Sequence, residues 1–169
     1  MTTTILPAQP RHLAGIASIY DRECLEGIAT FMTCPRTMDE WRAWLVEHDS
    51  PRHFALVAAE GDNVLGFASI APWSPRQAYA RTVESSVYVA PHAQGRGAGT
   101  LLMQAALRQV QAAGACVVIA RVVDQNRHSV TFHERLGFET IGIQRRAGEK
   151  FGQLLDVRIM DKHLDQKFD

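Results

Sequence analysis

The stretch Gln94-Gly95-Arg96-Gly97-Ala98-Gly99 lies between an alternating apolar segment, residues 82–89, and a helical pattern over residues 100–113. Glycines let the backbone approach a ligand closely, and the N–H groups at the start of a helix attract anions. A strand, a glycine loop and a helix in this order therefore predict a site for a pyrophosphate group.

Two common phosphate-binding motifs do not match this loop. The Walker motif requires Gly-Lys-Ser/Thr, and the dinucleotide motif G-x-G-x-x-G would need a glycine at the position of Thr100. The spacing is G-x-G-x-G instead. An ordinary tight connection between a strand and a helix remains the alternative interpretation at this point.

Hydrophobic spacing on both sides of the loop predicts mixed α and β structure. We expect helices over residues 10–24, 37–48, 100–113 and 126–136, and strands over residues 54–60, 64–71, 82–89, 115–123, 139–145 and 154–160. Thr37 and Glu40 have the spacing of a capping box. The order of elements predicts an α/β fold (α+β mixed sheet), a central mixed β-sheet flanked by helices, in one domain over residues 1–169.

Two of the strands have patterns that bear on the fold. Residues 82–89 alternate, so Val83, Val87 and Val89 should face one side of the sheet and Glu84 and Tyr88 the other. Residues 115–123 are nearly all apolar, which predicts a strand buried on both faces.

The composition limits the classes of function. The chain has 169 residues, 46% of them hydrophobic, and 18 basic against 18 acidic residues, so bulk charge gives no support for nucleic-acid binding. The sequence contains no apolar run of about 18 residues, so no membrane span is predicted. The N-terminus has no pattern of a signal peptide, and we expect a cytoplasmic protein. The cysteine and histidine spacings predict neither a disulfide framework nor a metal site.

The glycine loop and three further segments resemble one family. Gln94-x-x-Gly97-x-Gly99 matches the Q/R-x-x-G-x-G/A motif of the GNAT (GCN5-related) N-acetyltransferases. Residues 82–89, the segment Asn126-x-x-Ser129-x-x-x-His133-Glu134-x-x-Gly137-Phe138, and Lys150-Phe151-Gly152-x-Leu154-Leu155-Asp156 are similar to segments of its phosphinothricin and methionine sulfone/sulfoximine N-acetyltransferase subgroup, in the same order.

The resemblance implies an enzyme that uses acetyl-CoA as co-substrate and needs no metal. The backbone of residues 87–89 would pair with the pantetheine arm, and the Val89 N–H would stabilise the tetrahedral oxyanion. Arg96 would add a charged contact to the cofactor, or else it is a solvated loop residue. Asn126 would face the cofactor, cap its helix, or do both. The implied cofactor-binding residues are Val87, Tyr88, Val89, Gln94, Gly95, Arg96, Gly97, Ala98, Gly99, Thr100, Asn126 and Ser129.

Two side chains are candidates for proton transfer. The resemblance makes Glu84 the general base that accepts a proton from the amine, and the alternative is a structural carboxylate paired to an arginine. His133 stands where many family members have a tyrosine that is proposed to protonate the leaving thiolate. His133 would serve in its place, or no acid is needed, or the histidine is a buried structural residue.

The resemblance also implies an acceptor site, lined by Phe31, Ser74, Pro75, Arg76, Glu84, Ser85 and Ser86. Arg76 would bind the α-carboxylate of a small amino-acid-like acceptor such as phosphinothricin, methionine sulfoximine or methionine sulfone, or else is a surface residue. Met32 and Cys34 depart from the subgroup pattern.

Other acceptors and assemblies stay open. A polyamine, an aminoglycoside or a protein N-terminus is an alternative acceptor, and a non-catalytic acyl-CoA sensor is an alternative class. The subgroup resemblance further implies a homodimer, with residues 154–160 near the contact.

Overall fold

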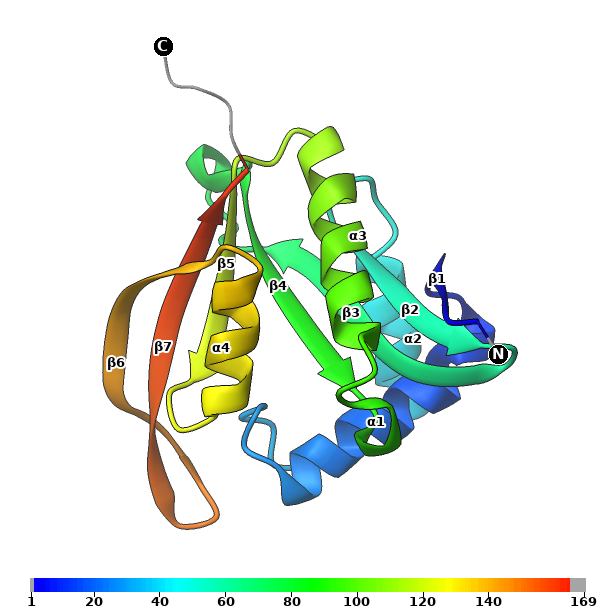
Figure 1. The fold of residues 1–169 in the computed structure, drawn as a ribbon, viewed down its shortest axis with the longest axis horizontal. Helices are drawn as coiled ribbons and strands as arrows, with labels where there is room; N and C mark the ends of the chain where they lie inside the picture. The colour runs from blue at the N-terminus through cyan, green and yellow to red at the C-terminus, as the bar shows by residue number, and fades with distance from the viewer. Residues whose placement is uncertain (1, 165–169) are drawn as a thin grey trace.

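The computed structural model describes residues 2–164, which form a seven-stranded mixed sheet with helices on both faces (Figure 1). The strands are β1 (Thr4–Pro7), β2 (Phe54–Glu60), β3 (Asn63–Pro72), β4 (Thr82–Val89), β5 (Val117–Val123), β6 (Glu139–Lys150) and β7 (Gln153–His163). The helices are α1 (Leu13–Glu26), α2 (Met38–Glu47), α3 (Ala98–Ala112) and α4 (Arg127–Arg135), with short 3-10 turns at Pro10–His12, Gln77–Tyr79 and Pro91–Ala93. The predicted central mixed sheet flanked by helices is confirmed.

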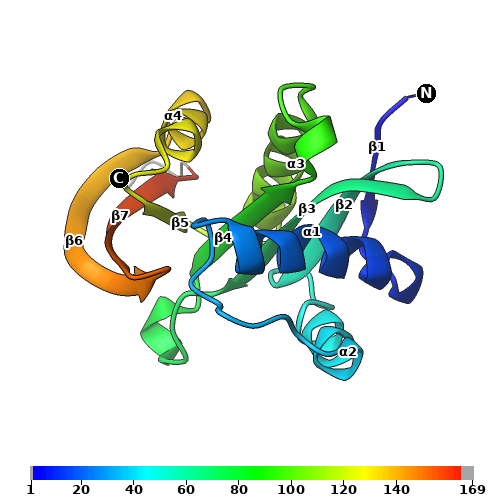
Figure 2. The ribbon, with the colours of Figure 1, turned by 90° about the horizontal axis from the view of Figure 1, so that it is seen from below.

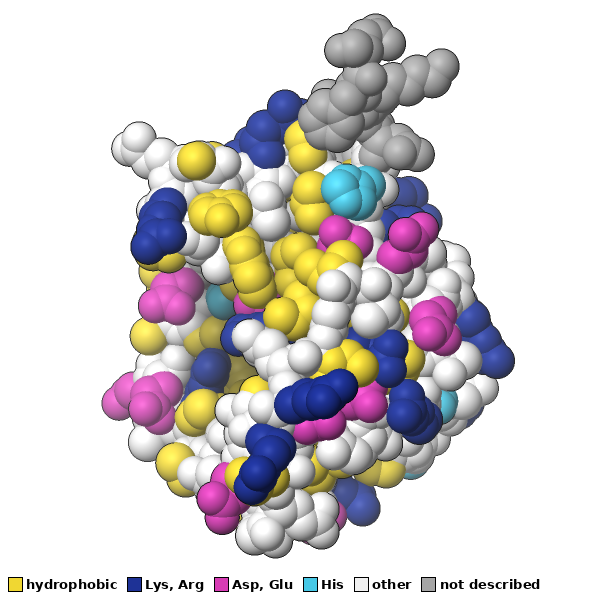
Figure 3. Space-filling model, turned by 90° about the vertical axis from the view of Figure 1, so that its left-hand side faces the viewer, with side chains coloured by type: hydrophobic (Ala, Val, Ile, Leu, Met, Phe, Trp, Pro, Cys, Tyr) yellow, Lys and Arg dark blue, Asp and Glu magenta, His cyan; other side chains and the backbone are white. Residues whose placement is uncertain are grey.

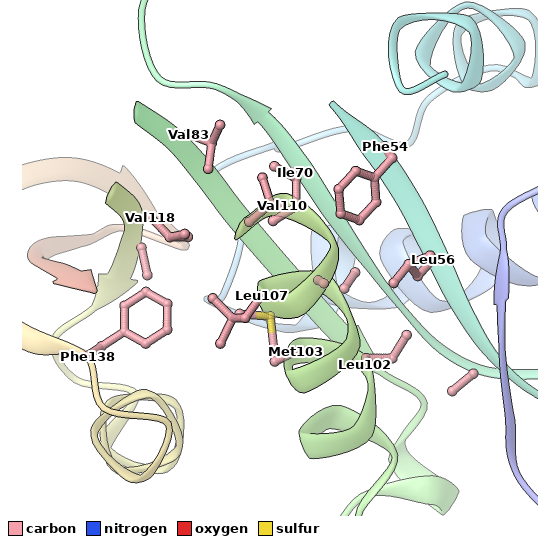
Figure 4. Close-up of a cluster of buried hydrophobic side chains, with 14 of the residues drawn as sticks. Phe54, Leu56, Ile70, Val83, Leu102, Met103, Leu107, Val110, Val118 and Phe138 are labelled. Carbon is pink, nitrogen blue, oxygen red and sulfur yellow. The ribbon is translucent and has the colours of Figure 1, made fainter. Parts of the chain in front are cut away.

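The helices form one layer on each side of the sheet. Helices α1 and α2 cover one face, and α3 and α4 cover the other (Figure 2). On the first face, Tyr20 of α1 and Trp41 of α2 pack edge-to-face with ring centroids 5.4 Å apart, and both rings also contact Phe67 of β3. On the second face, Leu102, Met103 and other apolar side chains of α3 point into the larger core, which includes Ile70 and Val83 (Figure 4).

Alternation along β4 matches the prediction. Val83, Val87 and Val89 join the core under α3, whereas Tyr88 packs against the aromatic cluster under α1. The predicted capping box is also confirmed, since the Thr37 N–H donates to Glu40 Oε2 at 2.7 Å and the Glu40 N–H donates to Thr37 Oγ1 at 3.3 Å.

The strand order is β1-β2-β3-β4-β5-β7-β6, and within residues 2–164 only the neighbours β4 and β5 run parallel. Strand β4 pairs with β3 from Val83 to Val89, but it pairs with β5 only from Thr82 to Glu84. Beyond Glu84 the two parallel strands separate. The sheet therefore opens in its middle, beside the end of β4 and the glycine loop.

Several elements differ from the sequence prediction. Strand β1 was not predicted, because a four-residue edge strand that ends in proline carries too short a pattern. Strands β6 and β7 are longer than expected, since much of β6 is exposed and lacks an apolar signal. The prediction that the strand over residues 115–123 is buried on both faces is wrong at Arg121, which is exposed at the opening.

Candidate active site

The opening between β4 and β5 presents backbone groups of β4 that the sheet does not use. The Ala90 N–H donates to the Leu65 carbonyl at 2.8 Å. This bond shows which residues of β4 have their backbone groups directed toward β3. Because antiparallel bonding alternates, the N–H and C=O groups of Val87 and Val89 point away from β3, toward the opening. The Val89 carbonyl accepts a hydrogen bond from Gln94 Nε2 at 3.3 Å. The Val89 N–H is thus directed into the opening and has no partner in the β3–β4 ladder.

A pocket lies in this opening and contains many of the predicted residues. It is lined by Ser85, Ser86, Val87, Tyr88, Asn126, Ser129 and His133, all of which the sequence singled out. It is also lined by Ala29, Ala120, Arg121, Val122 and Val123, which the sequence analysis missed. Among the missed residues, only Arg121 carried a signal, as the one charged residue in the otherwise apolar strand.

The glycine loop has the backbone that an anion site needs. Gly95 and Gly97 have φ values of +72° and +86°, and a Cβ added at either would meet no atom within 4 Å. The positive φ is therefore the reason why glycine occupies both positions. Gly97 is also the N-cap of α3. The first N–H groups of α3 have no intrahelical partner and face outward at the helix start. Gly99 packs closely, since an added Cβ would lie 3.3 Å from Val89 Cγ2.

Arg96 is largely exposed at the same loop. Its guanidinium lies 3.9 Å from Glu60 Oε1, a long ion pair between a side chain 60% exposed and one 15% exposed. An ion pair at this distance, with the arginine largely exposed, contributes little, so Arg96 is free to exchange Glu60 for another anion.

Glu84 forms a bidentate ion pair with Arg121. Arg121 Nε donates to Glu84 Oε1 at 2.6 Å, and Arg121 Nη2 donates to Oε2 at 2.9 Å. The guanidinium also lies over the Trp73 ring, 5.8 Å from its centroid. The arginine partner that the structural alternative required is therefore present. The same pairing holds the Glu84 carboxylate next to Arg121, which lines the pocket, so its position is compatible with a role as a base.

His133 is buried beneath the pocket. Its Nδ1 lies 2.8 Å from the Ser129 carbonyl, and its ring packs edge-on against Phe132 and Phe138. Burial lowers the pKa of His133 more than the Ser129 hydrogen bond raises it. The side chain is therefore neutral at neutral pH, with Nδ1–H donating to the carbonyl and Nε2 left as an acceptor.

Asn126 caps the helix that carries His133. Its Oδ1 accepts a hydrogen bond from the Ser129 N–H at 3.1 Å, which confirms the helix-capping interpretation. Both Asn126 and Ser129 also line the pocket, so capping and pocket lining coexist.

The predicted acceptor residues are only partly together. Ser85 and Ser86 line the pocket, and the buried Ser85 hydroxyl lies 3.4 Å from the Ile119 carbonyl. Phe31, the segment 74–76 and Glu84 are outside the pocket lining, and Glu84 touches it through its partner Arg121. Arg76 is exposed, and its N–H donates to Ser74 Oγ at 3.3 Å.

Residues 2–164 contain neither a membrane-spanning helix nor a cluster of metal ligands. No helix in that range has both the length and the apolar composition needed to cross a bilayer. Within the same range, no three His, Cys, Asp or Glu side chains are grouped as metal ligands would be.

Comparison with known proteins gives the same family as the motifs. The model of the acetyltransferase (GNAT) family matches residues 16–138. The chain is 34% identical over 166 residues to the L-methionine sulfoximine/L-methionine sulfone acetyltransferase of Pseudomonas paraeruginosa, which covers 98% of this chain and 96% of that protein. It is also 34% identical over 163 residues to the phosphinothricin N-acetyltransferase of Streptomyces coelicolor, which covers 95% of each.

The fold matches as closely as the sequence. A putative acetyltransferase from Salmonella typhimurium, solved with its cofactor acetyl-CoA, has a TM-score of 0.94 and 31% identity, and the match covers 100% of this chain and 98% of that one. The opening in the sheet, the glycine loop and the four motif segments thus agree with both kinds of comparison: the chain belongs to the GNAT acetyltransferase family.

Proposed function

We propose that this chain acetylates the α-amine of a small amino-acid-like acceptor, such as methionine sulfoximine, methionine sulfone or phosphinothricin. As a family member, the chain is an acetyl-CoA-dependent N-acetyltransferase. The choice of acceptor is supported by full-length relatives named for these substrates. The observation that carries the proposal is the opening between β4 and β5, which has the glycine loop on one side and Glu84 on the other.

The residues around the opening fit acetyl-CoA. In this proposal the N–H groups from Gly95 to Thr100 hold the pyrophosphate, because the loop leaves open space around two glycines at a helix start. Gln94, Arg96, Asn126 and Ser129 complete the cofactor site. The free backbone edge of residues 87–89 binds the pantetheine arm through main-chain hydrogen bonds, as it would bind an added strand.

The proposed chemistry is direct transfer. Glu84 accepts a proton from the acceptor amine, whose nitrogen then attacks the thioester carbonyl. The Val89 N–H stabilises the negative charge on the carbonyl oxygen while the C–N bond forms. The C–S bond then breaks, and the CoA thiolate leaves and takes up a proton. His133 is neutral, so it must first gain a proton before it can donate one to the thiolate. Its proposed catalytic role depends on this step.

The proposed acceptor site lies on the Glu84 side of β4. Arg76 binds the acceptor carboxylate with both arms of its guanidinium, and Ser74 and Pro75 shape the loop that carries it. Phe31 closes the site, while Ser85 and Ser86 line it beside Glu84. The exposed position of Arg76 leaves its guanidinium available for this contact.

We further propose that the chain acts as one catalytic domain and as a homodimer in the cytoplasm. Figure 3 shows hydrophobic side chains gathered on the face that carries β6, where Ile141 and Ile143 are 58% and 43% exposed. Most apolar residues of 154–160 are buried inside the subunit, so the dimer contact is better assigned to β6 and Leu154. Three free cysteines support a reducing compartment.

A thiol-release assay tests the proposed function. The protein is mixed with acetyl-CoA and, separately, methionine sulfoximine, methionine sulfone, phosphinothricin and spermidine, and free CoA is measured with a thiol reagent. Release with the three amino-acid-like acceptors and not with spermidine is expected. Release with spermidine alone would contradict the acceptor class, and tight CoA binding without release by any amine would favour a sensor.

A further inference from the structure

Lys150, the last residue of β6, has a buried side chain that is only 3% exposed. Lysine is rarely buried unless its charge has partners. Its Nζ donates hydrogen bonds to two backbone carbonyls, those of Thr30 at 2.8 Å and Glu23 at 3.1 Å. Glu23 lies in the last turn of α1, where a cation is favoured by the helix dipole. Lys150 therefore ties the end of β6 to α1 and to the loop that follows it.

The turn after Lys150 places an aromatic ring beside the ammonium. Strands β6 and β7 are joined by two residues only, Phe151 and Gly152, with φ values of +53° and +70°. These values are typical of a tight type I′ hairpin, in which a phenylalanine is unusual. The Phe151 ring lies 5.2 Å from Lys150 Nζ, within cation–π distance. Figure 1 shows this hairpin end below α4, near the end of α1.

Gly148 makes a second contact with the same loop. A Cβ added at Gly148 would overlap the ring of Phe31. The φ of Gly148 is not positive, so it is the close approach of Phe31 that requires a glycine there. Phe31 therefore lies directly on the β6 backbone.

These contacts act on the wall of the pocket. Thr30 is held by Lys150 and Phe31 by Gly148, while Ala29, the preceding residue, lines the pocket between β4 and β5. From the other side, α1 holds the loop through the Tyr20 hydroxyl, which lies 2.8 Å from Thr30 Oγ1. Residues 29–31 are thus held between α1 and the end of β6, next to the proposed acceptor site.

We infer that Lys150 and Gly148 are positioning residues of the acceptor site, which hold residues 29–31 at the distance that the acceptor requires. This inference rests on the proposed function. If it is correct, loss of either contact raises the KM for the acceptor more than the KM for acetyl-CoA, because the glycine loop that would hold the pyrophosphate lies outside the pocket that Ala29 lines.

The test uses Lys150→Met, which keeps most of the length of the side chain but removes its donors, and Gly148→Ala, which displaces Phe31. Matched controls are Lys162→Met on the neighbouring strand and Gly142→Ala on β6, where an added Cβ meets no atom within 4 Å. Steady-state kinetics are measured with methionine sulfoximine and acetyl-CoA varied separately. We expect an acceptor KM raised about tenfold in both variants and unchanged in both controls.

The outcomes separate this inference from the proposed function. If wild-type protein releases no thiol with methionine sulfoximine or the other amino-acid-like acceptors, the proposed function fails and the inference with it. If the wild type is active and the acceptor KM of both variants stays within about twofold of it, only the inference fails. An equal rise in both KM values would indicate a merely structural role and would also overturn it. If Lys150→Met does not fold, Gly148→Ala against Gly142→Ala decides.

Discussion

Arg121 and Glu84 pair side by side across the point where β4 and β5 separate. The last backbone pair between these strands is Glu84 with Ile119, and Arg121 lies two residues further along β5. The Arg121 side chain is 54% exposed, and its guanidinium donates both hydrogen bonds to the carboxylate of Glu84, whose side chain is 18% exposed. A planar, two-pronged pair fixes the orientation of both groups. The proposed base is therefore held against Arg121, a residue of the pocket lining, before an acceptor binds.

Replacing Arg121 tests whether this orientation matters. Arg121→Met should lower kcat/KM for the acceptor by about tenfold to a hundredfold, because hydrogen bonds between charged groups are lost and Glu84 is released. The measurement is steady-state kinetics with methionine sulfoximine, and Arg108→Met on the exposed side of α3 is the control. Activity of Arg121→Met equal to that of the control would mean that the ion pair has no part in the reaction.

The cofactor side of the site was predictable from sequence, because its determinants are local. The bounds of β4, the glycine loop and the Asn126 cap each depend on neighbouring residues, and each was predicted. Helix α3 begins at Ala98, two residues earlier than expected, because Gly97 adopts the left-handed conformation that caps it.

The acceptor side depends on contacts between distant segments, and the sequence could not supply them. Arg121 pairs with Glu84 from 37 residues away, and Lys150 reaches Thr30 across 120 residues. An arginine within an apolar run shows no partner in the sequence. A lysine next to a hairpin turn carries the pattern of an exposed residue, since burial of its charge depends on two distant carbonyls.

Gly97 allows a test of the glycine loop. Gly97→Ala should weaken acetyl-CoA binding, because a side chain at φ +86° costs about 1 kcal/mol and shifts the N–H groups of the loop. The melting temperature should fall by about 2–4 °C. Calorimetric titration with acetyl-CoA measures the affinity, and Gly142→Ala is the control for an added methyl group. An unchanged acetyl-CoA Kd would exclude the loop from the cofactor site.

His133 predicts how stability depends on pH. Burial lowers its pKa in the folded protein below the ordinary value of 6.5. Below pH 6.5 the unfolded chain therefore binds a proton that the folded chain does not, and the free energy of unfolding decreases as the pH falls. Burial lowers the pKa of His48 as well, so the effect is shared.

Thermal unfolding at pH 7.5 and 5.5 checks this account of His133. The wild type should lose stability at the lower pH, and His133→Gln should lose less than the wild type. His128→Gln, at an exposed position on the same helix, is the control and should follow the wild type. An identical loss in His133→Gln and wild type would show that this histidine is not buried in its neutral form.

The most direct test of the catalytic proposal is the turnover of Glu84→Gln at neutral pH, measured together with its affinity for acetyl-CoA. A glutamine keeps the shape of the side chain but cannot accept the proton of the amine. We predict that kcat with methionine sulfoximine falls by about a hundredfold to ten-thousandfold, and that acetyl-CoA binding stays within about twofold of wild type. Glu139→Gln, exposed on β6, is the control. Wild-type turnover in Glu84→Gln would contradict the assignment of Glu84 as the general base.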